Sequence, residues 1–414
     1  MSATLELANR LSPTGLDSQL SEEEQAVRDS AHRFAQEVLR PIGRELDRMT
    51  PEQVIAAESP LWTVFQQAAN LGMESLTELP MDQAHTYIAL MLEELGWGDA
   101  GLAVSLGAAQ TPQRLAYHCD NKFLKENIPA DAIGCWGITE PDHGSDMFQF
   151  MSSASERDIN LGRPNCVAKI RGNEVVITGQ KSAWVSNGTF AQYCALFCAC
   201  DTGNGPTESV ALVVPLDAKG VSRGKPLDKM GQRALNQGEV YFDNVSLPID
   251  WLIAPPEYYS QVATAQLVEA NSGMGLMFTG LARAGFELAL DYAHERTQGG
   301  RSIIAHQNVR QRLFHMFRQV EASRALARRS IAYSSTSGQP SLLAAISSKI
   351  TATQTALDVC SASLQMHGGN GLTREYETEK LFRDARASLI EDGCNEVLAI
   401  KGGTQLMSEE ALSL

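Results

Sequence analysis

The sequence predicts an α+β protein in which a helical domain, a β domain and a second helical domain follow one another. Amphipathic helical patterns fill both ends of the 414-residue chain, whereas its middle holds short β-branched runs bounded by turn residues. The pattern changes near residues 131 and 252, so we expect domains over 1–131, 132–252 and 253–414. With 43% hydrophobic residues, the chain can bury the core that such domains need.

The first helical domain begins at Ser21, which is a suitable N-cap because three glutamates follow it. Amphipathic periodicity then predicts helices over 22–39, 61–71 and 84–95. The same periodicity in the second helical domain predicts helices over 278–294, 308–332, 342–366 and 379–388.

The middle domain is predicted to be a small antiparallel sheet, because its runs are rich in β-branched residues. We expect strands over 166–170, 174–179, 209–214 and 239–242. A turn-like Arg171-Gly172-Asn173 separates the first two strands, and Asp243-Asn244 follows the last.

The formal net charge of −15 argues against non-specific binding to nucleic acid or anionic membranes, because both require a basic patch. No apolar run approaches the roughly 20 residues that span a bilayer. The first twenty residues are neither hydrophobic nor arginine-rich. We therefore expect no nucleic-acid or membrane partner and a cytoplasmic location.

Three of the eight cysteines, Cys194, Cys198 and Cys200, would face the same side of a strand, which resembles a metal site. The alternative is a set of small buried core thiols in a reducing compartment, which we favour because the other cysteines are scattered. No metal is predicted.

Two segments near the C-terminus carry candidate chemistry. Glu391 and Asp392 are adjacent carboxylates directly before Gly393, where a general base could lie. Upstream, residues 365–371 include three glycines within four positions, so backbone amides there could approach a ligand closely. Together these segments predict a flat, phosphate-bearing cofactor beside a proton acceptor.

Four separated motifs carry a resemblance to a known family. They are Trp136 to Asp146 (WGITEPDHGSD), Gly179 to Gly188 (GQKSAWVSNG), Tyr292 to Arg296 with His306-Gln307, and Gln365 to Gly371. In this order they resemble the acyl-CoA dehydrogenases, which are flavoenzymes. The resemblance covers nearly the whole chain. It implies an N-terminal helical domain, a middle β domain, a C-terminal four-helix bundle and an FAD cofactor.

The first two motifs resemble one side of the family's cofactor site. Thr139 resembles the residue that hydrogen-bonds the flavin pyrimidine edge, and Ser145 the one that meets the CoA pyrophosphate. Trp184 would lie against the isoalloxazine, and Ser186 would approach flavin N5. The alternative for Trp184 is a buried aromatic side chain of the β core. We also count Trp136, Cys394 and Glu396 among the predicted cofactor-binding residues.

The other two motifs resemble contacts made across a subunit interface. Arg296 and Gln307 resemble groups that hold the FAD phosphates and adenine, and a guanidinium suits a pyrophosphate because it can donate two parallel hydrogen bonds. Gln365, Gly368 and Gly369 resemble backbone contacts to the same cofactor from the partner subunit. The glycines could equally form a helix C-cap, and both roles can hold at once. The resemblance implies a homotetramer built as a dimer of dimers.

The base segment departs from the family pattern Tyr-Glu-Gly-Thr. Alignment on Gly393 places Asp392 at the catalytic base and Glu391 at the tyrosine. Because aspartate is one methylene shorter than glutamate, the substrate must lie closer, the helix must shift, or the base has a different task.

Further departures occur around the expected substrate site. Ala270-Asn271 replaces an acidic or small residue followed by arginine, and Glu269 would point about 100° away from the position that supplies the base in some relatives. Gly299 replaces an aromatic residue, the loop near 76–82 is shortened, and Lys401 is the nearest cation after the base segment. These departures predict an unusual acyl group, such as a branched, cyclic or carrier-protein-bound one.

Three interpretations remain. The leading one is an FAD-dependent α,β-dehydrogenase of acyl-CoA or acyl-carrier-protein thioesters. In this interpretation Asp392 takes the Cα proton, and hydride passes from Cβ to flavin N5. An electron-transfer flavoprotein or a similar acceptor then takes the electrons. The second is an oxidase on the same fold that resembles the nitroalkane-oxidising relatives, which use aspartate as the base. The third is a non-catalytic flavoprotein scaffold, against which the retained Thr139, Trp184, Ser186 and Arg296 argue.

Overall fold

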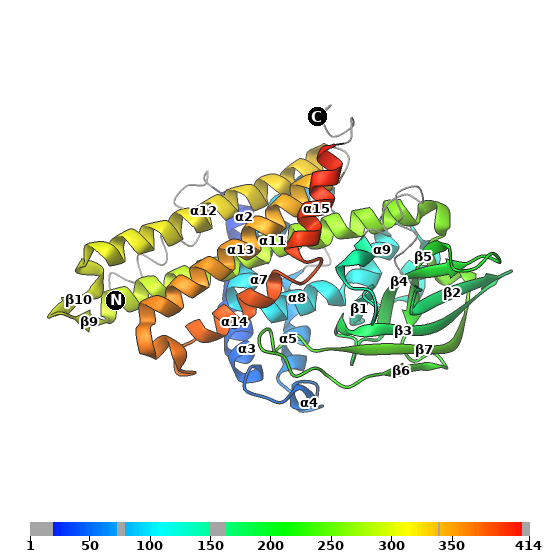
Figure 1. Ribbon diagram of the computed structural model, residues 1–414, viewed down its shortest axis with the longest axis horizontal. Coiled ribbons are helices and arrows are strands. Elements are labelled where there is room, and N and C mark those ends of the chain that lie inside the picture. Colours follow the sequence, from blue (N-terminus) through cyan, green and yellow to red (C-terminus); the bar gives the residue numbers. More distant parts are fainter. Residues whose placement is uncertain (1–19, 73–78, 149–162, 338–339, 408–414) are drawn as a thin grey trace.

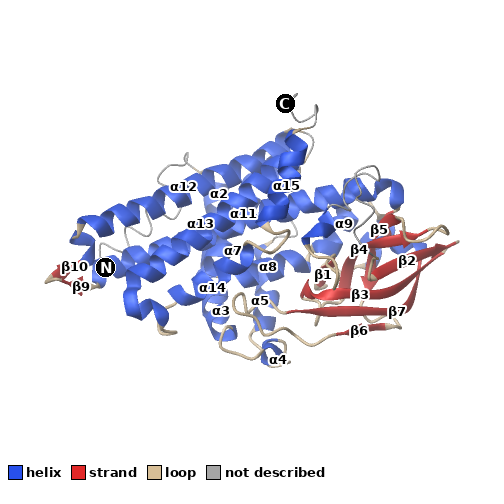
Figure 2. Cartoon of the chain, viewed as in Figure 1, coloured by secondary structure: helices blue, strands red, loops and turns tan. Residues whose placement is uncertain are grey.

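The computed structural model describes residues 20–72, 79–148, 163–337 and 340–407, and it shows a helical body with a sheet at one end (Figure 1). Figure 2 shows the same division, with the strands of the main sheet gathered beside the helices. The predicted order of helical, β and helical parts is confirmed. Part of the predicted shortened loop near 76–82 lies outside the described residues.

The helices of the N-terminal part are α2 (Glu22–Phe34), α3 (Arg40–Leu46), α4 (Pro51–Val54), α5 (Leu61–Ala68), α7 (Met81–Gly98), α8 (Ala100–Ala109), α9 (Thr111–His118) and α10 (Lys122–Asn127). Ser21 is the N-cap of α2, as predicted, and it forms a capping box with Glu24. Helix α8 escaped prediction because seven of its ten residues are buried, so that no polar face marks its period.

The strands of the main sheet are β1 (Gly134–Gly137), β2 (Cys166–Arg171), β3 (Glu174–Ser186), β4 (Tyr193–Asp201), β5 (Glu208–Pro215), β6 (Val221–Arg223), β7 (Gln237–Pro248) and β8 (Leu252–Ala254). Their order is β6-β7-β3-β2-β4-β5-β8, and β1 pairs with β4. Strand β4 runs parallel to both β1 and β2, so the prediction of a purely antiparallel sheet is corrected to a mixed one. The hairpin signal between β2 and β3 could not reveal this, because parallel partners are joined by long connections.

The C-terminal part consists of α11 (Pro256–Glu295), the hairpin β9 (Thr297–Gln298) and β10 (Arg301–Ser302), α12 (Gln307–Thr336), α13 (Leu342–His367), α14 (Thr378–Ser388) and α15 (Asn395–Leu406). Helix α11 has 40 residues and begins well before the predicted start at 278. At 1.5 Å per residue it is about 60 Å long. It runs from beside the sheet to the opposite end of the molecule, where β9 and β10 lie (Figure 1).

Helices α7 and α11 approach each other closely at two glycines. A Cβ on Gly280 would lie 1.9 Å from the carbonyl oxygen of Glu93, and one on Gly96 would lie 1.9 Å from that of Met277. Only glycine permits this backbone contact. Met277, which lies at this crossing, also lines the cavity described next.

Candidate active site

A cavity of about 1690 Å³ lies where the β domain meets the N-terminal half of α11. Helices α7, α8 and α9 form one side, and the end of α14 with the loop that follows it, from Arg386 to Gly393, forms another. Apolar side chains line the stretch between α7, α8 and α11, including Met91, Leu92, Val104 and Met277. Most ligand-binding pockets combine such apolar walls with a few polar groups, and this cavity has both.

The predicted cofactor contacts of the first two motifs come together in this cavity. Trp136, Thr139, Ser145, Trp184 and Ser186 all line it. Trp184 is 58% exposed, which excludes the alternative that it is a buried aromatic of the β core. The indole Nε1 of Trp136 is buried and has no hydrogen-bond partner among the described residues. An exposed ring face and an unpaired N–H donor fit a planar cofactor that carries hydrogen-bond acceptors.

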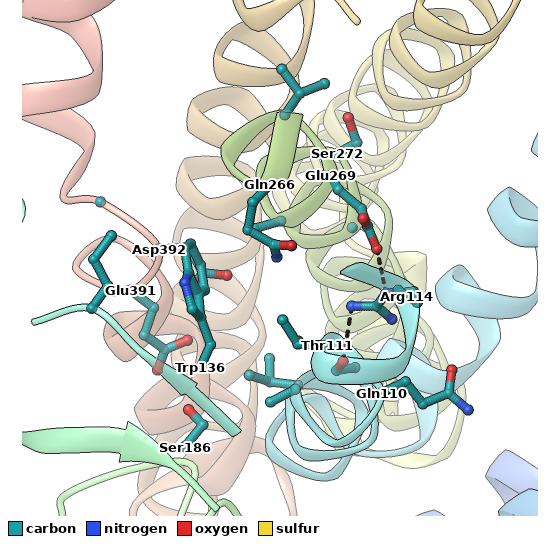
Figure 3. Close-up of a pocket in the computed structure, with 18 of the residues that line it drawn as sticks. Gln110, Thr111, Arg114, Trp136, Ser186, Gln266, Glu269, Ser272, Glu391 and Asp392 are labelled. Atoms are coloured by element: carbon teal, nitrogen blue, oxygen red, sulfur yellow. Dashed lines mark hydrogen bonds and ion pairs between the residues drawn. The ribbon is translucent and has the colours of Figure 1, made fainter. Parts of the chain in front are cut away.

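Both predicted catalytic carboxylates also line the cavity, and Figure 3 shows them near Trp136 and Ser186. Asp392 has a left-handed backbone (φ 49°), and its carbonyl oxygen accepts a hydrogen bond from Asn271 Nδ2 at 3.2 Å. The next carbonyl, that of Gly393, accepts one from Lys349 Nζ at 2.8 Å. The loop is therefore held through its backbone.

The two carboxylates differ in their hydrogen bonds. The side-chain N–H of Gln232 donates to Glu391 Oε2 at 3.0 Å. Among the described residues, no side-chain hydrogen bond is recorded for the Asp392 carboxylate. Asp392 is thus the carboxylate whose oxygens remain available to a ligand.

Burial dominates the electrostatics of the loop. It raises the pKa of Glu391 to about 7, against the opposing charge of Lys229, and the neighbouring Asp392 charge adds to the rise. Burial also raises the pKa of Asp392, and the Lys349 ammonium opposes that rise. Burial lowers the pKa of Lys349 itself to about 8. Two carboxyl groups with raised pKa values in one cavity are typical of a site that transfers protons.

A buried charge cluster of Asp99, Lys380 and Asp384 contacts Gln232, the residue that donates a hydrogen bond to Glu391. The backbone N–H of Gln232 donates to the Asp384 carboxylate, and its side chain also donates to the Asp384 carbonyl oxygen at 3.2 Å. Lys380 Nζ lies 2.6 Å from Asp384 Oδ2 and 2.6 Å from Asp99 Oδ2. We did not predict this cluster. The Lys380-to-Asp384 spacing on a predicted helix was the only available signal, and it is equally common on solvated helix faces.

A second ion pair, also not predicted, lies in the cavity wall between α9 and α11. Arg114 Nε lies 2.5 Å from Glu269 Oε1, and Figure 3 shows the pair on the side of the cavity away from Glu391 and Asp392. His118 Nε2 lies 3.8 Å from Glu269 Oε2. Glu269 therefore faces the cavity, and it is paired with a cation.

The predicted cofactor residues of the last two motifs lie outside the cavity. Arg296 caps the C-terminus of α11, Gln307 begins α12, and Gln365, Gly368 and Gly369 lie at the end of α13. All five are exposed, and none lines the cavity. Arg296 is 25 residues from Asn271 along α11, which corresponds to about 37 Å. Gly368 is indeed the C-cap of α13, with φ 59°.

Two predicted cofactor residues, Cys394 and Glu396, follow the carboxylate loop in the chain. Cys394 is the N-cap of α15, and its backbone N–H donates to Ser145 Oγ at 3.0 Å. This hydrogen bond joins the first motif to the base segment. Glu396 lies in the first turn of α15, is exposed, and does not line the cavity.

The three clustered cysteines of β4 lie apart from the cavity. Cys194, Cys198 and Cys200 are buried on one face of β4, within a hydrophobic cluster of the sheet. No group of three or more potential metal ligands is found within the described ranges. None of the described helices is both long and apolar enough to cross a membrane.

The fold and the cavity together define a cofactor-dependent oxidoreductase. Models of three acyl-CoA dehydrogenase domains match consecutive parts of the chain: the N-terminal domain over 21–117, the middle domain over 135–245 and the C-terminal domain over 260–407. The probable acyl-CoA dehydrogenase YngJ of Bacillus subtilis is 28% identical over 95% of this chain and 100% of its own length.

Two further comparisons agree. The short-chain specific acyl-CoA dehydrogenase of Clostridium acetobutylicum is 27% identical over 94% of this chain and 99% of its own. The solved structure of butyryl-CoA dehydrogenase from Megasphaera elsdenii shares the fold, with a TM-score of 0.80, 24% identity and coverage of 95% of this chain and 100% of that one. The chain belongs to the acyl-CoA dehydrogenase family, and it is an FAD-dependent oxidoreductase that acts on acyl-CoA.

Proposed function

We propose that the chain removes two hydrogens from the Cα–Cβ bond of an acyl thioester whose acyl group differs from an ordinary straight-chain fatty acid. The thioester is carried by CoA or by an acyl carrier protein. The observation that carries this proposal is the half-buried pair Glu391 and Asp392, which lines the same cavity as Trp136, Thr139 and Ser186.

Asp392 is the proposed base. Its carboxylate lines the cavity, and its backbone is held by Asn271, so the side chain can accept the Cα proton without movement of the loop. Gln232 holds Glu391, whose role is to stay beside the base and not to react. FAD, when bound, supplies the hydride acceptor for Cβ. Thr139, Trp184 and Ser186 are the proposed contacts to its ring system.

The short side chain of Asp392 restricts where the substrate can lie. An aspartate must lie nearer to the Cα proton than a glutamate would, and the neighbouring wall of α11 carries Ala270-Asn271 where the family has an acidic or small residue followed by arginine. These differences support an acyl group of unusual shape. An electron-transfer flavoprotein or a similar acceptor would take the electrons.

The second candidate function is oxidation of a nitroalkane, because relatives on this fold use an aspartate base for that reaction. The Ser145 hydroxyl beside Cys394 favours the thioester, since a nitroalkane has no pyrophosphate for it to bind. A non-catalytic scaffold would not need two carboxylates in the flavin cavity.

Anaerobic mixing of the purified protein with a panel of acyl-CoAs and nitroalkanes tests the proposal. We expect at least one acyl-CoA to bleach the flavin absorbance, because proton removal and flavin reduction occur together. Bleaching by nitroalkanes alone would favour the oxidase, and no bleaching by either class would favour the scaffold.

We also propose that the protein is a homotetramer in which each FAD contacts two subunits. Trp184 lines the cavity beside the N-terminal half of α11, whereas Arg296 caps the C-terminus of that helix, so one cofactor can meet both residues only if a neighbouring subunit supplies the second. A monomer would leave much of the cofactor in water.

Arg296→Lys should weaken FAD retention by about 1–3 kcal/mol, because one ammonium cannot reproduce two parallel hydrogen bonds to a pyrophosphate. The measurement is FAD content per subunit after size-exclusion chromatography with light scattering. Arg171→Lys, at the exposed last residue of β2, is the matched control and should retain the cofactor fully. A colourless wild-type monomer that ignores added FAD would contradict the subunit arrangement.

A further inference from the structure

Ser186 lines the cavity near Glu391, and its hydroxyl is already paired on one side (Figure 3). Its Oγ accepts a hydrogen bond from Gln237 Nε2 at 3.2 Å. Within the part of the chain that the structure describes, no acceptor is recorded for the hydroxyl hydrogen. A serine hydroxyl can donate or accept, so the group that pairs with it inside the protein decides which of the two it offers to a ligand. Here that group is the carboxamide of Gln237.

Two further contacts fix the orientation of this carboxamide. Its Oε1 accepts a hydrogen bond from Lys229 Nζ at 2.7 Å, and its Nε2 also donates to the carbonyl oxygen of Trp184 at 3.3 Å. An ammonium can only donate and a carbonyl can only accept, so turning the carboxamide over would break both contacts. Gln237 is 5% exposed, and a buried polar group that loses its partner is costly. Nε2 therefore stays on the side of Ser186.

Lys229 carries the charge that this arrangement requires. Burial lowers its pKa to about 8, and the negative charges of Glu391 and Asp384 oppose that change. The ammonium is therefore the main form at neutral pH. Its Nζ also donates to the carbonyl oxygen of Leu235 at 2.6 Å, which holds it in place. Lys229 thus acts on the carboxylate loop through its charge and on Ser186 through the carboxamide of Gln237.

We propose that Lys229 and Gln237 fix the Ser186 hydroxyl as a hydrogen-bond donor into the cavity, which makes Gln237 a positioning residue for the reacting edge of the flavin. The inference rests on the proposed contact between Ser186 and flavin N5, and it gives that contact a direction. Because Gln237 Nε2 donates to Ser186 Oγ, the hydroxyl hydrogen must point away from Gln237. A donor in this place suits N5 of oxidised flavin, which is a hydrogen-bond acceptor.

The affinities of the protein for FAD and for 5-deaza-FAD test this inference without an acyl substrate. The analogue has a C–H group in place of N5, so it cannot accept the hydrogen bond. Each flavin is titrated into the full-length apoprotein by calorimetry. We expect the wild-type protein to bind FAD about tenfold more tightly, because the analogue leaves the Ser186 donor without a partner. Ser186→Ala should remove this preference, since no donor remains.

Gln237→Glu is the most specific variant. It keeps the length of the side chain and can still pair with Lys229, but a carboxylate only accepts, so the Ser186 hydroxyl should turn to it and the preference for FAD should disappear. Gln237→Leu should lower the preference by releasing the hydroxyl, and it serves if the glutamate variant folds poorly. Lys229→Met should have a smaller effect, since the Trp184 carbonyl still orients the carboxamide. Gln180→Glu places the same carboxylate on β3 outside the cavity and should keep the preference.

Three results would overturn the inference or separate it from the proposed reaction. Equal binding of both flavins by the wild-type protein would overturn it. Weaker binding of both flavins by Gln237→Glu and Gln237→Leu, with the wild-type preference retained, would show that Gln237 only stabilises the fold and would also overturn it. A preference that depends on Gln237, in a protein whose flavin no acyl-CoA reduces, would support the inference and contradict the proposed dehydrogenation alone.

Discussion

Asp392→Asn should abolish flavin reduction by the true substrate, lowering its rate by about 10²–10⁴-fold, while FAD stays bound. The amide keeps the shape of the side chain but cannot accept the Cα proton. Because the loop is held through its backbone by Asn271 and Lys349, the substitution should leave the loop in position. The measurement is anaerobic stopped-flow reduction of the flavin, with FAD content determined by absorbance.

The pH dependence of that rate follows from the raised pKa of Asp392. A protonated carboxyl cannot act as a base, so the rate should fall as the pH is lowered through the pKa of Asp392, at a higher pH than for an ordinary aspartate. Glu391→Gln should reduce the rate far less, since Gln232 already holds that carboxylate. Near wild-type reduction by Asp392→Asn, with loss in Glu391→Gln or Glu269→Gln, would show that the base is a different carboxylate.

Lys380→Met should lower the free energy of unfolding by about 3–5 kcal/mol, because it leaves the carboxylates of Asp99 and Asp384 buried without their shared cation. The loss should shrink as the pH falls, since burial raises the pKa of Asp384 and protonation of that carboxylate removes an unpaired charge. The measurement is urea unfolding at two pH values. Reduction of the flavin should also slow, because the cluster holds Gln232 and, through it, Glu391.

Two further variants test whether the loss of stability comes from the buried cluster of Lys380, Asp99 and Asp384. Lys122→Met removes an exposed lysine of α10 that lies 3.7 Å from Glu126, and it should change stability by less than about 1 kcal/mol. Adding Asp384→Asn to Lys380→Met should recover part of the lost stability by removing one unpaired charge. If Lys380→Met is as stable as the wild-type protein, the lysine does not hold the cluster together.

The predictions from sequence succeeded where the signal is local. The Ser21 cap, the long C-terminal helices and the hairpin of β2 and β3 follow from residues close together in the chain, and all three are observed. Prediction failed for α8, which is buried all round, and for the parallel pairing of β4 with β1 and β2, which joins segments far apart in sequence. Neither feature leaves a periodic pattern.

The residues of the candidate site also divide into those that local sequence predicts and those that only packing brings together. The motifs were sufficient to identify Thr139, Trp184 and Asp392 as candidates, because each lies in a short run of residues with a recognisable order. Sequence spacing could not pair Arg114 with Glu269, which are 155 residues apart, since contacts at that separation depend on how the helices pack.

The sequence by itself determined the family, the order of the three parts and the candidate base, since these depend on residue types and local order. Only the tertiary structure decided which carboxylate carries a hydrogen bond, how polar the cavity wall is, and that the predicted cofactor contacts form two clusters, one in the cavity beside the N-terminal half of α11 and one at the C-terminus of that helix. Burial, desolvation and long-range ion pairing arise when distant segments pack together, and local order does not encode them.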